Sequence, residues 1–249
     1  MIGWVGQANA GPGAPGMATV VLVSGNARCS DDHRTWRTLK KGDRLKPGCL
    51  VQTAERSLVE LILGDSVAAT SISISLDGVH GDDVAEPLAN VVRLAEESVL
   101  ALNKLPDGRF GGTQAEETQL DLEAGQIAGS VTRMSADSKY EIKLAKGVAG
   151  VRGSSRYVLG SNGSARANSG SLVVVQMAGD DLLPAKVVTA GHKFDATTGT
   201  VVEAPLGEYP ISPVKLGTAP TSSAAPGSNP PLIPGPPSDF HRALPSRRF

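Results

Sequence analysis

Residues 139–175 decide the fold, and they read KYEIKLAKGVAGVRGSSRYVLGSNGSARANSGSLVVV. Apolar and polar side chains alternate over residues 139–144, which predicts a half-buried strand. A glycine-rich segment at 147–154 and a second apolar segment at 157–159 precede the turn sequence at 160–163. Because glycine and asparagine adopt positive φ at low cost, this turn predicts a β-hairpin. We expect a second turn at 168–170, between a short polar strand and the apolar strand 172–175.

The rest of the chain repeats this pattern of short apolar segments and turns. Such segments occur at residues 18–23, 57–63, 68–76, 91–94, 99–102, 120–122 and 127–131. We expect the last two to pair with each other across Ala124 and Gly125. Helical periodicity is almost absent, so the pattern predicts an all-β protein. The expected architecture is a single β-rich domain, either a twisted sandwich or a solenoid-like stack of short strands, without a fixed repeat period.

Composition divides the chain into three parts. Residues 1–17 are expected to be an export-signal remnant or a flexible leader, because an apolar start precedes the small residues Ala8 and Ala10. Residues 18–205 are expected to form the β domain. Residues 206–249 are dominated by proline, serine, alanine and glycine, which cannot bury enough apolar surface to offset chain entropy. They are expected to form a disordered tail.

Charge and hydropathy argue against several classes of partner. The 249 residues carry a formal net charge of −1, so no overall attraction to nucleic acid or anionic lipid is expected. No apolar segment is long enough to span a membrane as a helix, which takes about 20 residues. We therefore expect no nucleic-acid partner and no transmembrane segment in this chain.

Chemistry-bearing motifs are scarce. The histidines (His33, His80, His192 and His241) are far apart and lack metal-ligand spacing. His80 is followed by two aspartates, which could hold a cation weakly, but a solvated loop is the simpler interpretation. Nucleophile-elbow and phosphate-loop motifs are absent from the sequence. We expect no enzymatic activity, no metal and no cofactor.

The two cysteines, Cys29 and Cys49, lie near strand ends on either side of a turn-rich segment. In an oxidising compartment they could form a disulfide, which would stabilise the fold by roughly 3 kcal/mol. The alternative is a pair of separate, partly buried thiols, because geometry cannot be read from the spacing alone.

The centre of the decisive stretch contains the motif Gly150-Val151-Arg152-Gly153-Ser154, followed by the aromatic Tyr157. This motif resembles the G-[VI]-R-G-[TS] signature of FecR-like domains. Other segments fit the family's patterns in chain order: 36–45 (W-x-x-L-x-x-G-D-x-L), 51–53 (I-x-T), 120–127 (L-x-L-x-x-G-x-[IVL]), 170–175 (the strand after the hairpin) and 188–194 (V-x-A-G-x-x-[FY]). The resemblance covers about residues 18–205. It departs from the family at Ser154, where threonine is commoner, at Tyr157, which comes one residue late, and at 76–90, which resembles an insertion.

The resemblance implies a non-catalytic sensor or interaction module of the bacterial cell envelope, located in the periplasm or outside the cell. A protein partner in the envelope and a link to signal transduction are implied with it. Relatives of the iron-citrate type regulate a sigma factor through a cytoplasmic segment and a transmembrane helix, which the sequence does not show. The resemblance therefore implies the outer β module alone. Two alternatives stay open: an exported structural or adhesive scaffold, and a carbohydrate-binding or hydrolytic β protein.

Specific roles follow for the residues of the motif. We expect Gly150, Gly153 and Gly170 to be required by backbone conformation. We expect Arg152 to clamp neighbouring strands through its guanidinium rather than to bind an anionic ligand. The side chains expected to face the core are Val151, Tyr157, Leu172 and Val174.

Overall fold

The structure is a computed structural model that describes residues 16–64, 90–106, 115–131, 135–179 and 181–204. All of them belong to one compact unit. They form strands, turns and bends without a helix, so the all-β prediction is confirmed. The leader up to residue 15, the expected strand at 68–76, the loop with His80 and the proline-rich tail lie outside the described residues.

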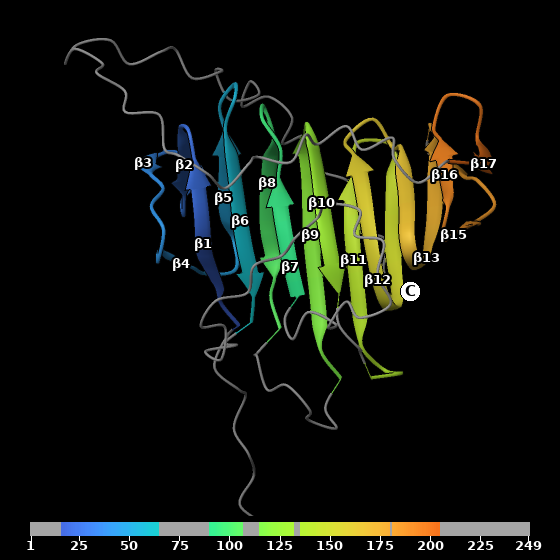
Figure 1. Ribbon diagram of the computed structural model, residues 1–249, viewed down its shortest axis with the longest axis horizontal. Helices are drawn as coiled ribbons and strands as arrows, with labels where there is room; N and C mark the ends of the chain where they lie inside the picture. The colour runs from blue at the N-terminus through green and yellow to red at the C-terminus, as the bar shows by residue number, and fades with distance from the viewer. Residues whose placement is uncertain (1–15, 65–89, 107–114, 132–134, 180, 205–249) are drawn as a thin grey trace, which may run out of the picture. The chain divides into compact units, whose positions relative to one another are not determined.

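The described strands form two layers that face each other across a common core (Figure 1). The first layer contains, in order of pairing, β4 (Arg44–Leu45), β1 (Ala18–Ser24), β6 (Leu58–Leu63), β7 (Asn90–Leu94), β10 (Gln126–Val131), one half each of β12 (Gly147–Gly160) and β13 (Ala165–Ala178), then β16 (His192–Asp195) and β17 (Thr200–Glu203). The second contains β3 (Arg37–Thr38), β2 (Ala27–Ser30), β5 (Cys49–Thr53), β8 (Val99–Lys104), β9 (Glu117–Ala124), β11 (Lys139–Leu144), the other halves of β12 and β13, and β15 (Lys186–Thr189). The short β14 (Asp181–Leu182) pairs with the end of β13.

Strands β12 and β13 belong to both layers, and they join them. The hairpin predicted at 160–163 is confirmed, because the Gly163 N–H donates to the Gly160 carbonyl at 2.9 Å. The predicted turn at 168–170 is wrong, since β13 continues through these residues without reversing. Pairing shifts register on both sides of Arg156, so bulges let both strands bend from one layer into the other.

At the end of the sandwich opposite the bend in β12 and β13, four arches carry the chain from one layer to the other. A contact between a glycine and a serine recurs in these arches. At one arch Gly25 has a φ of 77°, and the next N–H, of Asn26, donates to Ser57 Oγ at 2.9 Å. At another, Gly125 also has a φ of 77°, and the next N–H, of Gln126, donates to Ser98 Oγ at 3.0 Å. The positive φ turns the chain between layers, and the serine satisfies the exposed N–H.

The same kind of contact occurs at the other end of the sandwich, where β12 and β13 bend from one layer into the other. Gly170 has a φ of 68°, and the N–H of Ser171 donates to Ser155 Oγ at 3.2 Å. A Cβ on Gly170 would lie 2.2 Å from that hydroxyl oxygen, so no other residue fits there without a shift. The same arrangement, a glycine of positive φ followed by an N–H that donates to a serine hydroxyl, therefore carries the chain between layers at both ends of the sandwich.

The expected pairing of 120–122 with 127–131 is wrong. Strand β9 pairs with β8 and β11 in the second layer, whereas β10 pairs with β7 and β12 in the first. The turn at Gly125 is an arch between layers rather than a hairpin within one sheet. Alternation of side chains along both strands is the same in either case, so the sequence pattern could not separate them.

Two tyrosines fill the centre of the core where the layers meet. Tyr140 and Tyr157 are 1% exposed each, their rings meet edge to face, and their hydroxyls lie 3.0 Å apart. Gly129 lies directly opposite Tyr157 on β10, where a Cβ would be 2.2 Å from the tyrosine ring. Burial raises the pKa of both phenols, so both stay neutral. The expectation that Val151, Tyr157, Leu172 and Val174 face the core is confirmed.

Replacing Gly129 with alanine should destabilise the fold by about 1–3 kcal/mol, because the added methyl group overlaps the Tyr157 ring. The matched control is Gly150→Ala, where a Cβ meets only the Val173 carbonyl oxygen at 3.9 Å. Urea unfolding of both variants measures the difference. Equal stability of the two variants would contradict the assigned packing.

Replacing Ser98 with alanine should cost about 1–3 kcal/mol, because the Gln126 N–H loses its acceptor at the arch. Ser154→Ala is the control, since the Ser154 hydroxyl makes no hydrogen bond to the described residues. Thermal unfolding at matched protein concentration compares them. A Ser98 variant as stable as the control would show that the arches do not depend on this contact.

Candidate interaction surface

The motif Gly150–Ser154 lies on β12 where this strand leaves the second layer. Val151 points into the core, whereas Arg152 and Gly153 are exposed. Gly170 lies across from the same crossing on β13, and Tyr157 occupies the core just beyond it. The structure thus brings these sequence-predicted residues together, at a crossing between layers rather than in a pocket.

Two of the three glycines have the conformation that was expected. Gly153 and Gly170 have φ values of 64° and 68°, which favour glycine. Gly150 does not lie in the positive-φ region, and a Cβ there would make only an ordinary contact with the Val173 carbonyl oxygen, so its expected conformational role is wrong. Gly150 instead leaves the outer face of the second layer without a side chain between Glu141 and Val173, its partners in the ladder.

The expected strand clamp at Arg152 is not formed. The side chain is exposed, and its guanidinium makes no hydrogen bond or ion pair with the described residues. Only the backbone takes part in the crossing, where the Arg152 carbonyl accepts a hydrogen bond from Ser155 Oγ at 3.1 Å. Glycines on either side were interpreted as close backbone approach, but the outward register of Arg152, opposite Ser171, directs its side chain to solvent.

Cys29 and Cys49 lie on the paired strands β2 and β5, and at most 1% of either is exposed. Both thiols are free in the structure, and the disulfide stays a prediction. Burial raises the pKa of Cys29, and it raises the pKa of Cys49 to about 12, so both thiols keep their protons near neutral pH. Protonated buried thiols are poor nucleophiles, and here they pack as small apolar side chains.

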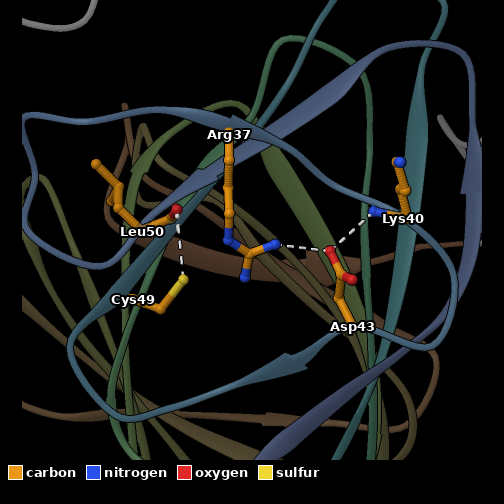
Figure 2. A network of polar contacts seen from close by, with 5 residues as sticks. All are labelled: Arg37, Lys40, Asp43, Cys49 and Leu50. Atoms are coloured by element: carbon orange, nitrogen blue, oxygen red, sulfur yellow. Dashed lines mark hydrogen bonds and ion pairs between the residues drawn. The ribbon is translucent and has the colours of Figure 1, made fainter.

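The polar contacts around Cys49 are structural (Figure 2). The thiol approaches the carbonyl oxygen of the next residue, Leu50, at 3.7 Å. Nearby, Arg37 Nη1 donates to Asp43 Oδ2 at 2.7 Å, and the same oxygen accepts the Lys40 N–H at 3.0 Å. Ion pairs this close to solvent contribute little to stability, so the contacts mainly fix the turn between β3 and β4.

An exposed apolar strip lies on the outer face of the second layer, at its C-terminal end. The ladder pairs Val148 with Val175 and Val173 with Val187, and all four side chains point outward. Val187 is 57% exposed and Val148 is 38% exposed. We call these four valines the apolar strip. Val173 and Val175 between them are half-buried, and a contiguous apolar patch on a sheet is a candidate contact site for another molecule.

The other end of the same outer face is covered by the chain itself. Trp36 packs against Leu50, Val99 and Ala101, which also point outward from their strands. The Arg28 guanidinium lies 4.2 Å from the centre of the Trp36 ring, a cation–π contact. The chain therefore covers apolar residues on this face near β5 and β8 and leaves those near β13 and β15 exposed.

The apolar strip ends at an open sheet edge. Among the described residues, the only ladder register of β15 is its antiparallel pairing with β13, on one side of the strand. Lys146 precedes Val148 by two residues and Lys186 directly precedes Val187; both lysines are exposed, and neither forms an ion pair with the described residues. Together the strip, the edge of β15 and these two cations form the candidate interaction surface.

Other kinds of site are not seen in the described part of the chain. Within it, no three His, Cys, Asp or Glu side chains are placed to hold a metal ion. No helix of sufficient length and hydropathy to cross a membrane occurs there either.

Comparison of the sequence with known protein families gives no match, and comparison with curated proteins gives none. The fold is similar to two crystal structures from Parabacteroides distasonis, each provisionally named an anti-sigma factor. One has a TM-score of 0.32 and 14% identity over 59% of this chain and 59% of its own. The other has the same TM-score and identity over 48% of this chain and 53% of its own. The chain thus spans a little over half the length of either, and similarity of this size assigns no function.

Sequence reasoning did not identify the candidate interaction surface. Of residues 172–175, only Leu172 and Val174 were expected to face the core, and both are buried, at 0% and 2% exposure. The alternating valines Val173 and Val175 belong to the outer face. The sequence did contain a signal for this surface: residues 172–175 are all apolar, so the strand has apolar side chains on both faces and needs cover on both.

Proposed function

We propose that this β domain is a non-catalytic, FecR-like sensor or interaction module of the bacterial cell envelope. It contacts one protein partner through the candidate interaction surface and transmits that contact in signal transduction. The resemblance of Gly150–Ser154 and the following hairpin to FecR-like domains supports the class of protein. Periplasmic or extracellular location is part of the proposal.

One observation carries the proposal: the apolar strip and the open edge of β15 lie on the strands that hold the resemblance. Val148 precedes the motif on β12, and Val173 and Val175 follow Gly170 on β13. Any binding at the strip would therefore act directly on the strands that join the two layers. A structural scaffold has no need of an uncovered apolar surface at that position.

A photo-crosslinking residue at Leu182, which is 72% exposed beside the strip, tests the proposal in the native host. We expect crosslinking to one envelope protein, and loss of that product when Val187→Asp is added, because a charge disrupts the apolar contact. The same crosslinker at Lys41, in the turn between β3 and β4, is the control.

Thermal unfolding should show that Val187→Asp folds normally, since Val187 is more than half exposed. Recovery of the protein from the cytoplasmic fraction would contradict the envelope location. Equal products from Leu182 and Lys41, or products that survive Val187→Asp, would contradict the assigned surface.

A further inference from the structure

We propose that β15 accepts an extended segment of the partner as a new strand, and that this segment carries apolar side chains on the outer face and an acidic side chain opposite Lys186. This inference rests on the proposed function and specifies the chemistry of the partner. Addition of a strand at an exposed sheet edge is a common way of recognising peptides, with main-chain hydrogen bonds for affinity and side-chain contacts for specificity.

The backbone of β15 presents hydrogen-bonding groups at the open edge. The Ala190 N–H donates to the Gly170 carbonyl at 3.1 Å, so this antiparallel pair is hydrogen-bonded. In such ladders hydrogen-bonded and non-hydrogen-bonded pairs alternate. Thr189, opposite Ser171, and Val187, opposite Val173, therefore direct their N–H and carbonyl groups away from β13. These groups are the ones that a new strand would pair with.

The outer face selects apolar side chains at every second position of the added strand. Val187 is the exposed end of the ladder row that continues through Val173 to Gly150. A residue opposite Val187 would pack on this row, where the missing side chain of Gly150 leaves the neighbouring valine accessible. Cross-strand pairs of β-branched residues stabilise such contacts by about 0.2–1 kcal/mol each.

The inner face selects an acidic side chain at the position opposite Lys186. Lys186 has the same parity as Val188, which is fully buried, yet Lys186 is exposed at the end of the strand. An inward-pointing lysine on an edge strand opposes indiscriminate pairing, because an apolar segment would bury its charge. A carboxylate opposite Lys186 removes that penalty.

The same lysine argues against a second copy of this chain as the occupant. In an antiparallel pair of two β15 strands centred on Val187, both Lys186 ammonium groups lie on one face as diagonal neighbours. Repulsion between them disfavours this dimer. Charge complementarity thus favours an acidic partner strand.

Short synthetic peptides test the inference on the wild-type protein. We expect a peptide of alternating valine and glutamate to bind, with new protection of the Val187 and Thr189 amides from hydrogen exchange. N-methylation of alternate peptide amides distinguishes the two edges of the peptide. Each N-methyl group on an amide that faces β15 removes one hydrogen bond and leaves a β15 carbonyl without its donor, so it should weaken binding about tenfold or more. Methyl groups on the amides of the other edge should leave binding unchanged.

A charge swap tests selectivity for acidic residues. Lys186→Glu should weaken the valine–glutamate peptide and favour a valine–lysine peptide, whereas Lys41→Glu, at the opposite end of the layers, should change neither. Equal effects of methylation on both peptide edges, or no preference for glutamate, would overturn strand addition. A concentration-dependent dimer that the peptide does not disrupt would also overturn it. If these tests fail while the Leu182 crosslink persists, the proposed function stands and the strand-addition mechanism is wrong.

Discussion

The fold depends on the close contact between Gly170 and Ser155, where β12 and β13 cross from one layer to the other. Gly170 has a φ of 68°, and a Cβ there would lie 2.3 Å from the Ser154 carbonyl oxygen. Only a residue without a side chain lets the two backbones approach so closely. Because every other described strand belongs to one layer, this hairpin is what joins the layers at that edge and sets the position of Tyr157 between them.

Much of the fold was predictable because alternation of apolar residues reports which residues face a core. The half-buried strand at 139–144 was predicted in this way, whereas the hairpin at 160–163 was predicted from the glycine and asparagine of its turn. The layer to which each strand belongs was not predictable, because a glycine at an arch and a glycine at a hairpin look alike in sequence. Similar segments, Ala54-Glu55-Arg56-Ser57 and Ala95-Glu96-Glu97-Ser98, form equivalent arches, but their spacing is not repeated elsewhere and gave no period.

The candidate site was less predictable than the fold because it consists of what the fold leaves uncovered. Val148 and Val173 are as apolar as core residues, and nothing in the sequence shows that the face to which they point is left uncovered. Arg152 is a second example. Its position between glycines indicated a clamp between strands, but its side chain points to the opposite face of β12 from the buried Val151 and is exposed. Sequence reasoning identified the strands that matter, β12 and β13, and missed the face on which they would act.

The central claim is that β12 and β13 make one cooperative unit of both layers. Native-state hydrogen exchange at increasing denaturant measures it most directly, through amides of Leu159 in the first layer and Val151 in the second. The account predicts that both amides exchange only through the same global opening, with equal free energies and equal denaturant dependence. Exchange of Val151 through a separate, lower-energy opening while Leu159 stays protected would contradict it.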